Sequence, residues 1–63
     1  MTKQQAVTFC NNHGYSNVGH LPYNKLRSVV VDVQRIADMK GYTMNEAEKT
    51  WLSQKLTELA RYV

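Results

Sequence analysis

The chain has 63 residues, a formal net charge of +3, a single cysteine, 43% apolar residues and 21% charged residues. This composition is that of a folded globular chain rather than a disordered one, and one cysteine excludes an internal disulfide, which favours a reducing, cytoplasmic setting. No run approaches the roughly 18 apolar residues of a membrane span, and residues 1–9 lack the apolar run of a signal peptide. We therefore expect one cytoplasmic domain over residues 1–63, close to the smallest size that folds unaided.

The first expected helix covers about residues 2–13. Thr2 and Gln5 have the spacing of a capping box, in which each side chain bonds the other residue's backbone N–H. Gly14 stands where many helices end with a glycine in the left-handed conformation. The less polar face of this helix carries Ala6, Phe9, Cys10 and His13.

The second expected helix covers about residues 22–40. Pro22 suits its first turn, where a missing N–H costs nothing, and Gly41 marks its end. Apolar residues at three- and four-residue spacing form a stripe within an arc of roughly 140°: Tyr23, Leu26, Val29, Val30, Val33, Ile36 and Ala37. The alternative is a strand over residues 28–33, because β-branched residues favour strands. Since a lone strand would have no partner in this chain, we predict the helix.

The third expected helix covers about residues 44–62, and a second capping box, Thr43 with Glu46, marks its start. Only Gly41 and Tyr42 separate it from the previous helix, which predicts an antiparallel helical hairpin. The predicted fold is therefore all-α, a three-helix domain. The third helix is apolar over roughly 220°, in two sectors: Met44, Ala47, Trp51 and Tyr62 in one, Leu52, Leu56, Leu59 and Val63 in the other.

Residues that could carry chemistry are few. Cys10, His13 and His20 are types that bind zinc, but a structural zinc site needs four ligands and no second cysteine exists. Cys10 with His13 is the only pair that resembles an activated nucleophile, and Cys10 is expected to face inward, where a thiol is inert. We therefore expect no enzymatic activity, no metal and no cofactor.

Binding to DNA is the alternative function. Phe9, Cys10, His13 and Gly14 resemble the pattern of a helix-turn-helix, but Pro22 would then interrupt the recognition helix. A looser basic patch could contact phosphates without reading sequence: Lys3, Lys25 and Arg27 with Tyr15, Tyr23 and His20. The cations are dispersed along the chain, so a solvated surface explains them as well.

Binding to another protein is the function that the surplus apolar surface of the third helix favours. Trp51 and Tyr62 are side chains that often anchor interfaces, although both could instead complete the monomer core. The first predicted partner surface comprises Trp51, Tyr62, Ala47 and Met44, and a weaker second one comprises Val31, Arg27 and Arg35. A homodimer would bury apolar surface that so short a chain cannot bury alone, and its interface would be two-fold and self-complementary.

The segment FCNNHGYSNVGHLPYNKLR, with the chain length and the helical hairpin after it, resembles a family of small early proteins of lambdoid bacteriophages. These proteins are encoded between the phage exonuclease and excisionase genes. The resemblance implies a non-enzymatic protein of the host-cell cytoplasm that acts early in infection, on host physiology or on the choice between lysis and lysogeny. It carries no catalytic residues over to this chain.

Overall fold

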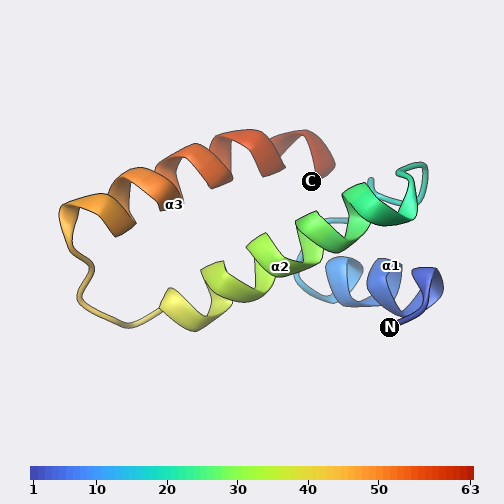
Figure 1. Ribbon diagram of the computed structural model, residues 1–63, viewed down its shortest axis with the longest axis horizontal. Helices are drawn as coiled ribbons and strands as arrows, with labels where there is room; N and C mark the ends of the chain where they lie inside the picture. Colours follow the sequence, from blue (N-terminus) through green and yellow to red (C-terminus); the bar gives the residue numbers. More distant parts are fainter.

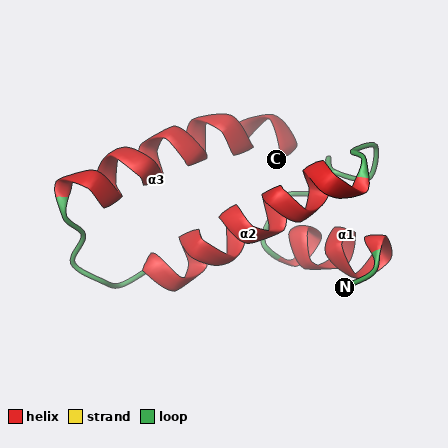
Figure 2. Cartoon of the chain, viewed as in Figure 1, coloured by secondary structure: helices red, strands yellow, loops and turns green.

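The computed structural model describes all 63 residues and contains three α-helices: α1 (Lys3–Asn12), α2 (Tyr23–Met39) and α3 (Glu46–Leu59) (Figure 1). A short 3₁₀ turn, η1 (Ala60–Tyr62), follows α3 directly. No strand is present (Figure 2), and residues 28–33 lie inside α2. The all-α, three-helix prediction is confirmed, and the strand alternative is wrong because the valines continue the helical stripe on both sides.

The start of α1 is the one that the sequence predicts. The Thr2 hydroxyl accepts from the Gln5 N–H at 3.2 Å, and the Gln5 side-chain oxygen accepts from the Thr2 N–H at 2.8 Å. Gly14, with φ of +90°, follows the C-cap residue His13 and turns the chain out of the helix. This prediction is confirmed, with each helix end one residue shorter than expected.

The start of α3 lies two residues further on than the predicted capping box. Asn45 is the N-cap: its side-chain oxygen accepts from the Glu48 N–H at 2.8 Å, and the Glu48 carboxylate accepts from the Asn45 N–H at 3.2 Å. The predicted pair of Thr43 and Glu46 is therefore wrong. Asparagine is a better N-cap than threonine, and this register places two carboxylates in the first turn, where the helix dipole favours them.

Two other boundaries differ from the predictions. Pro22 is the residue before α2 rather than its first helical residue, and it therefore interrupts no helix. The expected third helix reaches its predicted end only because the 3₁₀ turn η1 continues α3 through Tyr62. Both differences arise at helix termini, where the backbone changes geometry over one or two residues.

The core lies at one end of the molecule, where α1, the connection after it, the first half of α2 and the end of α3 meet (Figure 1). The connection is tied to the C-terminal turn, because the Asn17 backbone N–H donates to the Tyr62 carbonyl at 3.0 Å. Ten residues are buried, and none of them is charged: Ala6, Cys10, Val18, Leu21, Leu26, Val29, Val33, Met39, Leu59 and Tyr62.

Helices α2 and α3 run antiparallel, as the predicted hairpin requires (Figure 1). Their contact is sparse, and no Cα atom of α1 lies within 8 Å of one in α3. Leu59 is the only buried residue of α3. In the C-terminal half of α3, Lys55 Nζ lies 3.4 Å from Asp32 of α2 and 3.3 Å from Glu58. Helix α3 is therefore anchored at its C-terminal end and only loosely attached elsewhere.

The overall dimensions agree with this loose attachment. The molecule measures 34 × 18 × 18 Å, and its radius of gyration is 11.9 Å. A compact domain of this length would have a radius of about 10.6 Å. Apolar side chains of α2 and α3 that would meet in a tighter bundle remain partly exposed.

Candidate protein-docking surfaces

Tyr62, the second aromatic of the predicted partner surface, belongs to the core. Only 6% of it is exposed, because the 3₁₀ turn after α3 points its ring toward the buried cluster. The prediction of Tyr62 as a surface anchor is therefore corrected: it completes the monomer, which is the alternative role that the sequence left open.

Trp51, the first aromatic of that surface, lies at the edge between α3 and α2. Its ring is half-buried, and the Arg35 guanidinium carbon lies 4.3 Å from the ring centroid, a cation–π geometry. The structure thus joins Trp51 to Arg35, two residues that the sequence assigned to separate surfaces. Ala47 is exposed and lies one turn before Trp51 on α3. Arg27 is exposed and lies two turns before Arg35 on α2, with its guanidinium carbon 5.9 Å from the centroid of the Tyr23 ring.

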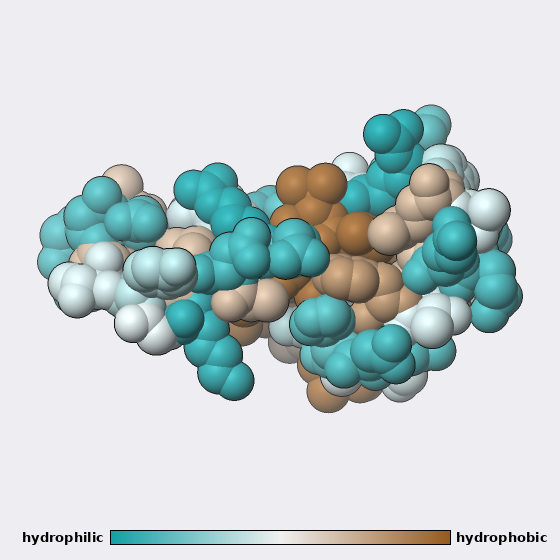
Figure 3. All heavy atoms as spheres, turned by 90° about the horizontal axis from the view of Figure 1, so that it is seen from below, coloured by the Kyte–Doolittle hydropathy of each residue, from teal (hydrophilic) through white to brown (hydrophobic).

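Val31 lies in a shallow apolar hollow between α1 and α2, and 65% of it is exposed. Figure 3, seen from below Figure 1, shows apolar side chains gathered near the middle of that side, with polar ones around them. We call this hollow, of about 400 Å³, the Val31 face; its lining is Met1, Phe9, Val30, Val31, Gln34, Arg35 and Asp38. Arg35 connects this face to Trp51, so one continuous surface runs across α2 and α3.

A second apolar hollow lies between the C-terminal half of α2 and the facing side of α3. We call it the Leu56 groove; its volume is about 360 Å³, and the start of the α1–α2 connection closes one side. Of the predicted partner residues only Met44 is here. The lining is His13, Tyr15, Val33, Ile36, Ala37, Met39, Lys40, Gly41, Tyr42, Met44, Leu52 and Leu56.

Sequence reasoning missed this groove as a docking site. Leu52 and Leu56, one turn apart, did identify a second apolar sector of α3. That signal indicates apolar surface on the side of α3 where the groove lies. The contributions of Tyr15 and Tyr42 have no periodic signal, because both lie outside the helices. Only the folded chain brings them to the same hollow.

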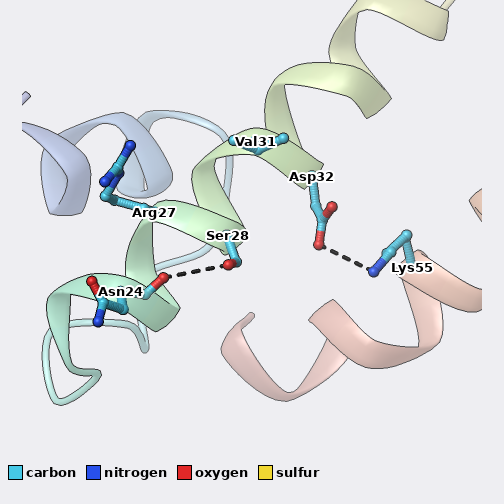
Figure 4. Close-up of a pocket in the computed structure, with 6 residues that line it drawn as sticks. All are labelled: Asn24, Arg27, Ser28, Val31, Asp32 and Lys55. Atoms are coloured by element: carbon cyan, nitrogen blue, oxygen red, sulfur yellow. Dashed lines mark hydrogen bonds and ion pairs between the residues drawn. The ribbon is translucent and has the colours of Figure 1, made fainter.

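A polar hollow, shown in Figure 4, lies over the N-terminal half of α2 and is lined by Asn24, Arg27, Ser28, Val31, Asp32 and Lys55. Lys55 is not free to bind an anion there, because it pairs with Asp32 and with Glu58. The hydrogen bond to Glu58 and the charge of Asp32 raise the pKa of Lys55 above its ordinary value. Arg27 points away from Lys55 in Figure 4, so the two cations do not converge.

The residues considered for chemistry lie in unlike surroundings. Cys10 is buried, and burial raises the pKa of its thiol, which keeps it in the unreactive protonated form. His13 is exposed; its Nδ1 lies 2.9 Å from the Phe9 carbonyl oxygen and its ring lies against the Phe9 ring. No three side chains of metal-binding type come together anywhere in the molecule.

The helix-turn-helix alternative has no counterpart in α1 and α2. Such a motif joins its two helices by a turn of about 3–4 residues, whereas residues 13–22 separate α1 from α2 here. What remains of the DNA-binding alternative is the set of three exposed cations Lys3, Lys25 and Arg27.

Comparisons of the chain with protein-family models, with curated proteins and with solved structures gave no match. None of the three helices has the length and apolar character needed to cross a bilayer. The fold and the two apolar hollows therefore define the class: an all-α, three-helix protein with a small core and apolar surface on two sides.

Proposed function

We propose that this chain is a non-enzymatic protein-binding module that works as a homodimer. The observation that supports this proposal is the mismatch between a ten-residue core and the apolar surface left on α2 and α3. Chains of this size usually need a disulfide, a metal or a partner subunit. The single cysteine leaves no internal disulfide, so a second copy is the partner that is always present.

The Val31 face is the surface best suited to self-association. A two-fold interface places the same residues of both copies against each other, so it must be complementary to itself. This face combines the exposed Val31 and the Phe9 ring with one cation, Arg35, and one carboxylate, Asp38. Arg35 of each copy would then find Asp38 of the other at the rim, and Trp51 under Arg35 would extend the contact.

The biological role that we propose rests on the resemblance to small early proteins of lambdoid phages. By this proposal the dimer acts in the cytoplasm of an infected host, on host physiology or on the choice between lysis and lysogeny, by docking on a host or phage protein. This proposal is supported by the sequence resemblance of residues 9–27 together with the helical hairpin.

Light scattering over a concentration series tests the dimer. We expect twice the monomer mass for the wild type and the monomer mass for Val31→Glu, because each Val31 face would bury an unpaired carboxylate. Val63→Glu, which changes another exposed valine outside the face, should remain dimeric. A wild type that is monomeric at every concentration, or a dimer insensitive to Val31→Glu, would refute self-association by this face.

Duplex DNA run beside the protein tests the second candidate function, which the exposed cations Lys3, Lys25 and Arg27 support. A DNA-binding regulator would shift with the duplex, and its affinity would fall steeply with salt as phosphate contacts were lost. Such a shift, weakened by Arg27→Gln, would replace the protein-binding proposal. Binding to protein alone predicts no shift.

A further inference from the structure

We propose that the Leu56 groove is the docking site for one amphipathic helix of a different protein, held by two or three apolar side chains and flanked by acidic residues. This inference deepens the protein-binding function proposed above and rests on it. It assigns the partner to the groove and leaves the Val31 face to the second copy.

The size of the groove suits a few inserted apolar side chains. Its volume of about 360 Å³ is at the low end for ligand pockets, which hold roughly 300–1,000 Å³. Two helices form its long walls, with Ile36 on α2 and Leu52 and Leu56 on α3. A helix laid along such walls inserts residues one turn apart, at three- and four-residue spacing.

The chemistry of the lining excludes other common modes of peptide binding. An all-α protein offers no strand edge for an added β-strand. Grooves for proline-rich segments are lined mainly by aromatic rings, whereas Tyr15 and Tyr42 are the only aromatic carbocycles among mostly aliphatic side chains here. A mostly aliphatic groove between two helices matches the apolar face of a third helix.

The charged residues at the groove indicate the sign of the charge that its occupant carries. His13 and Lys40 line it, and no carboxylate does. A second copy would bring the same basic residues and a further net charge of +3 to the contact, and like charges brought together weaken an interface. An apolar helix with aspartates or glutamates beside its anchors would meet the opposite charge of Lys40 instead. The Val31 face differs because Arg35 and Asp38 both line it.

The groove is unfilled because α3 is loosely held. Leu59 is the only buried residue of α3, and Leu56, one turn earlier, is 47% exposed. An inserted apolar side chain would contact both helices and so add the packing that they lack. Binding should therefore protect the backbone amides in the first half of α3 from hydrogen exchange.

The experiment uses two labelled 15-residue helical peptides with the same three leucines at i, i+4 and i+7 and the same alanines. One carries glutamates at the flanking positions and the other lysines. Fluorescence anisotropy measures their binding to the full chain. We expect the acidic peptide to bind the wild type at least about tenfold more tightly than the basic one.

Two variants and one control decide whether the groove is the site. Leu56→Asn removes an anchor contact without adding charge and should weaken the acidic peptide about tenfold. Lys40→Glu should weaken the acidic peptide and strengthen the basic one. Val63→Asn, an exposed valine outside both the groove and the Val31 face, should change neither affinity.

The outcomes separate this inference from the proposed function. Equal binding of the two peptides, no binding of either, or indifference to Leu56→Asn would overturn the groove as a site for an acidic helix. If the protein is then still a dimer sensitive to Val31→Glu, the dimeric module stands. A monomer that binds the acidic peptide through Leu56 would instead support the groove and refute the dimer.

Discussion

Replacing Leu59 by alanine tests whether α3 is held mainly by its C-terminal end. Leu59 is 2% exposed and belongs to the core. The substitution removes apolar material equivalent to about three methylene groups, worth ~2.4 kcal/mol of transfer free energy. The cavity left behind raises the loss in unfolding free energy to about 3 kcal/mol. A domain of this length has a total stability of about 3–9 kcal/mol, so the variant should lose between about one third and all of its stability.

Leu56→Ala is the matched control, because it makes the same chemical change on the same helix one turn earlier. Leu56 is 47% exposed and lines an open groove, so its removal leaves no closed cavity. About half of the transfer free energy is lost, roughly 1 kcal/mol. Urea unfolding followed by circular dichroism measures both values, and in thermal melts each kcal/mol corresponds to about 4–8 °C.

The ratio of the unfolding free energies lost by the two variants decides whether α3 is held mainly at its C-terminal end. A Leu59→Ala variant that loses about three times as much stability as Leu56→Ala supports anchoring at the C-terminal end. Equal losses, or a larger one for Leu56→Ala, would show that α3 is packed along its whole length and that the Leu56 groove is closed in solution.

Three further predictions concern the α3 cap, the thiol and the ion pair. Asn45→Ala should lower the unfolding free energy by about 1 kcal/mol, whereas Thr43→Ala should change it by less than about 0.5 kcal/mol, in urea titrations; the reverse order would place the cap at Thr43. Cys10 should react with an aromatic disulfide reagent only as fast as the chain opens, so a native rate equal to that in urea would show an accessible thiol. The pKa of Lys55 is raised in the folded protein, chiefly by its hydrogen bond to Glu58. The charged Lys55 side chain therefore stabilises the fold fully at pH values below the ordinary lysine pKa of 10.5, and this stabilisation is lost as the pH rises through the raised pKa. The melting-temperature difference between wild type and Lys55→Met should therefore narrow as the pH rises past 10.5, and a constant difference would assign it to packing.

The local features of the fold were predictable from the sequence because they depend on neighbours a few residues apart. The Thr2 capping box, the turn at Gly14 and the apolar stripe of α2 each involve groups within one or two helical turns. The start of α3 was ambiguous at this level, since Thr43 and Asn45 each precede a glutamate by three residues. The stronger cap decided that start.

The candidate sites were predictable only in part. The sequence alone determined three helices, a hairpin and surplus apolar surface on α3, because helix periodicity is a property of the chain itself. Which surplus residues became core was decided by tertiary structure: the turn after α3 buried Tyr62 against the α1–α2 connection, while Trp51 came to lie under Arg35. The Leu56 groove likewise depends on how far α3 stands from α2, a distance set by packing between residues remote in sequence rather than by any local pattern.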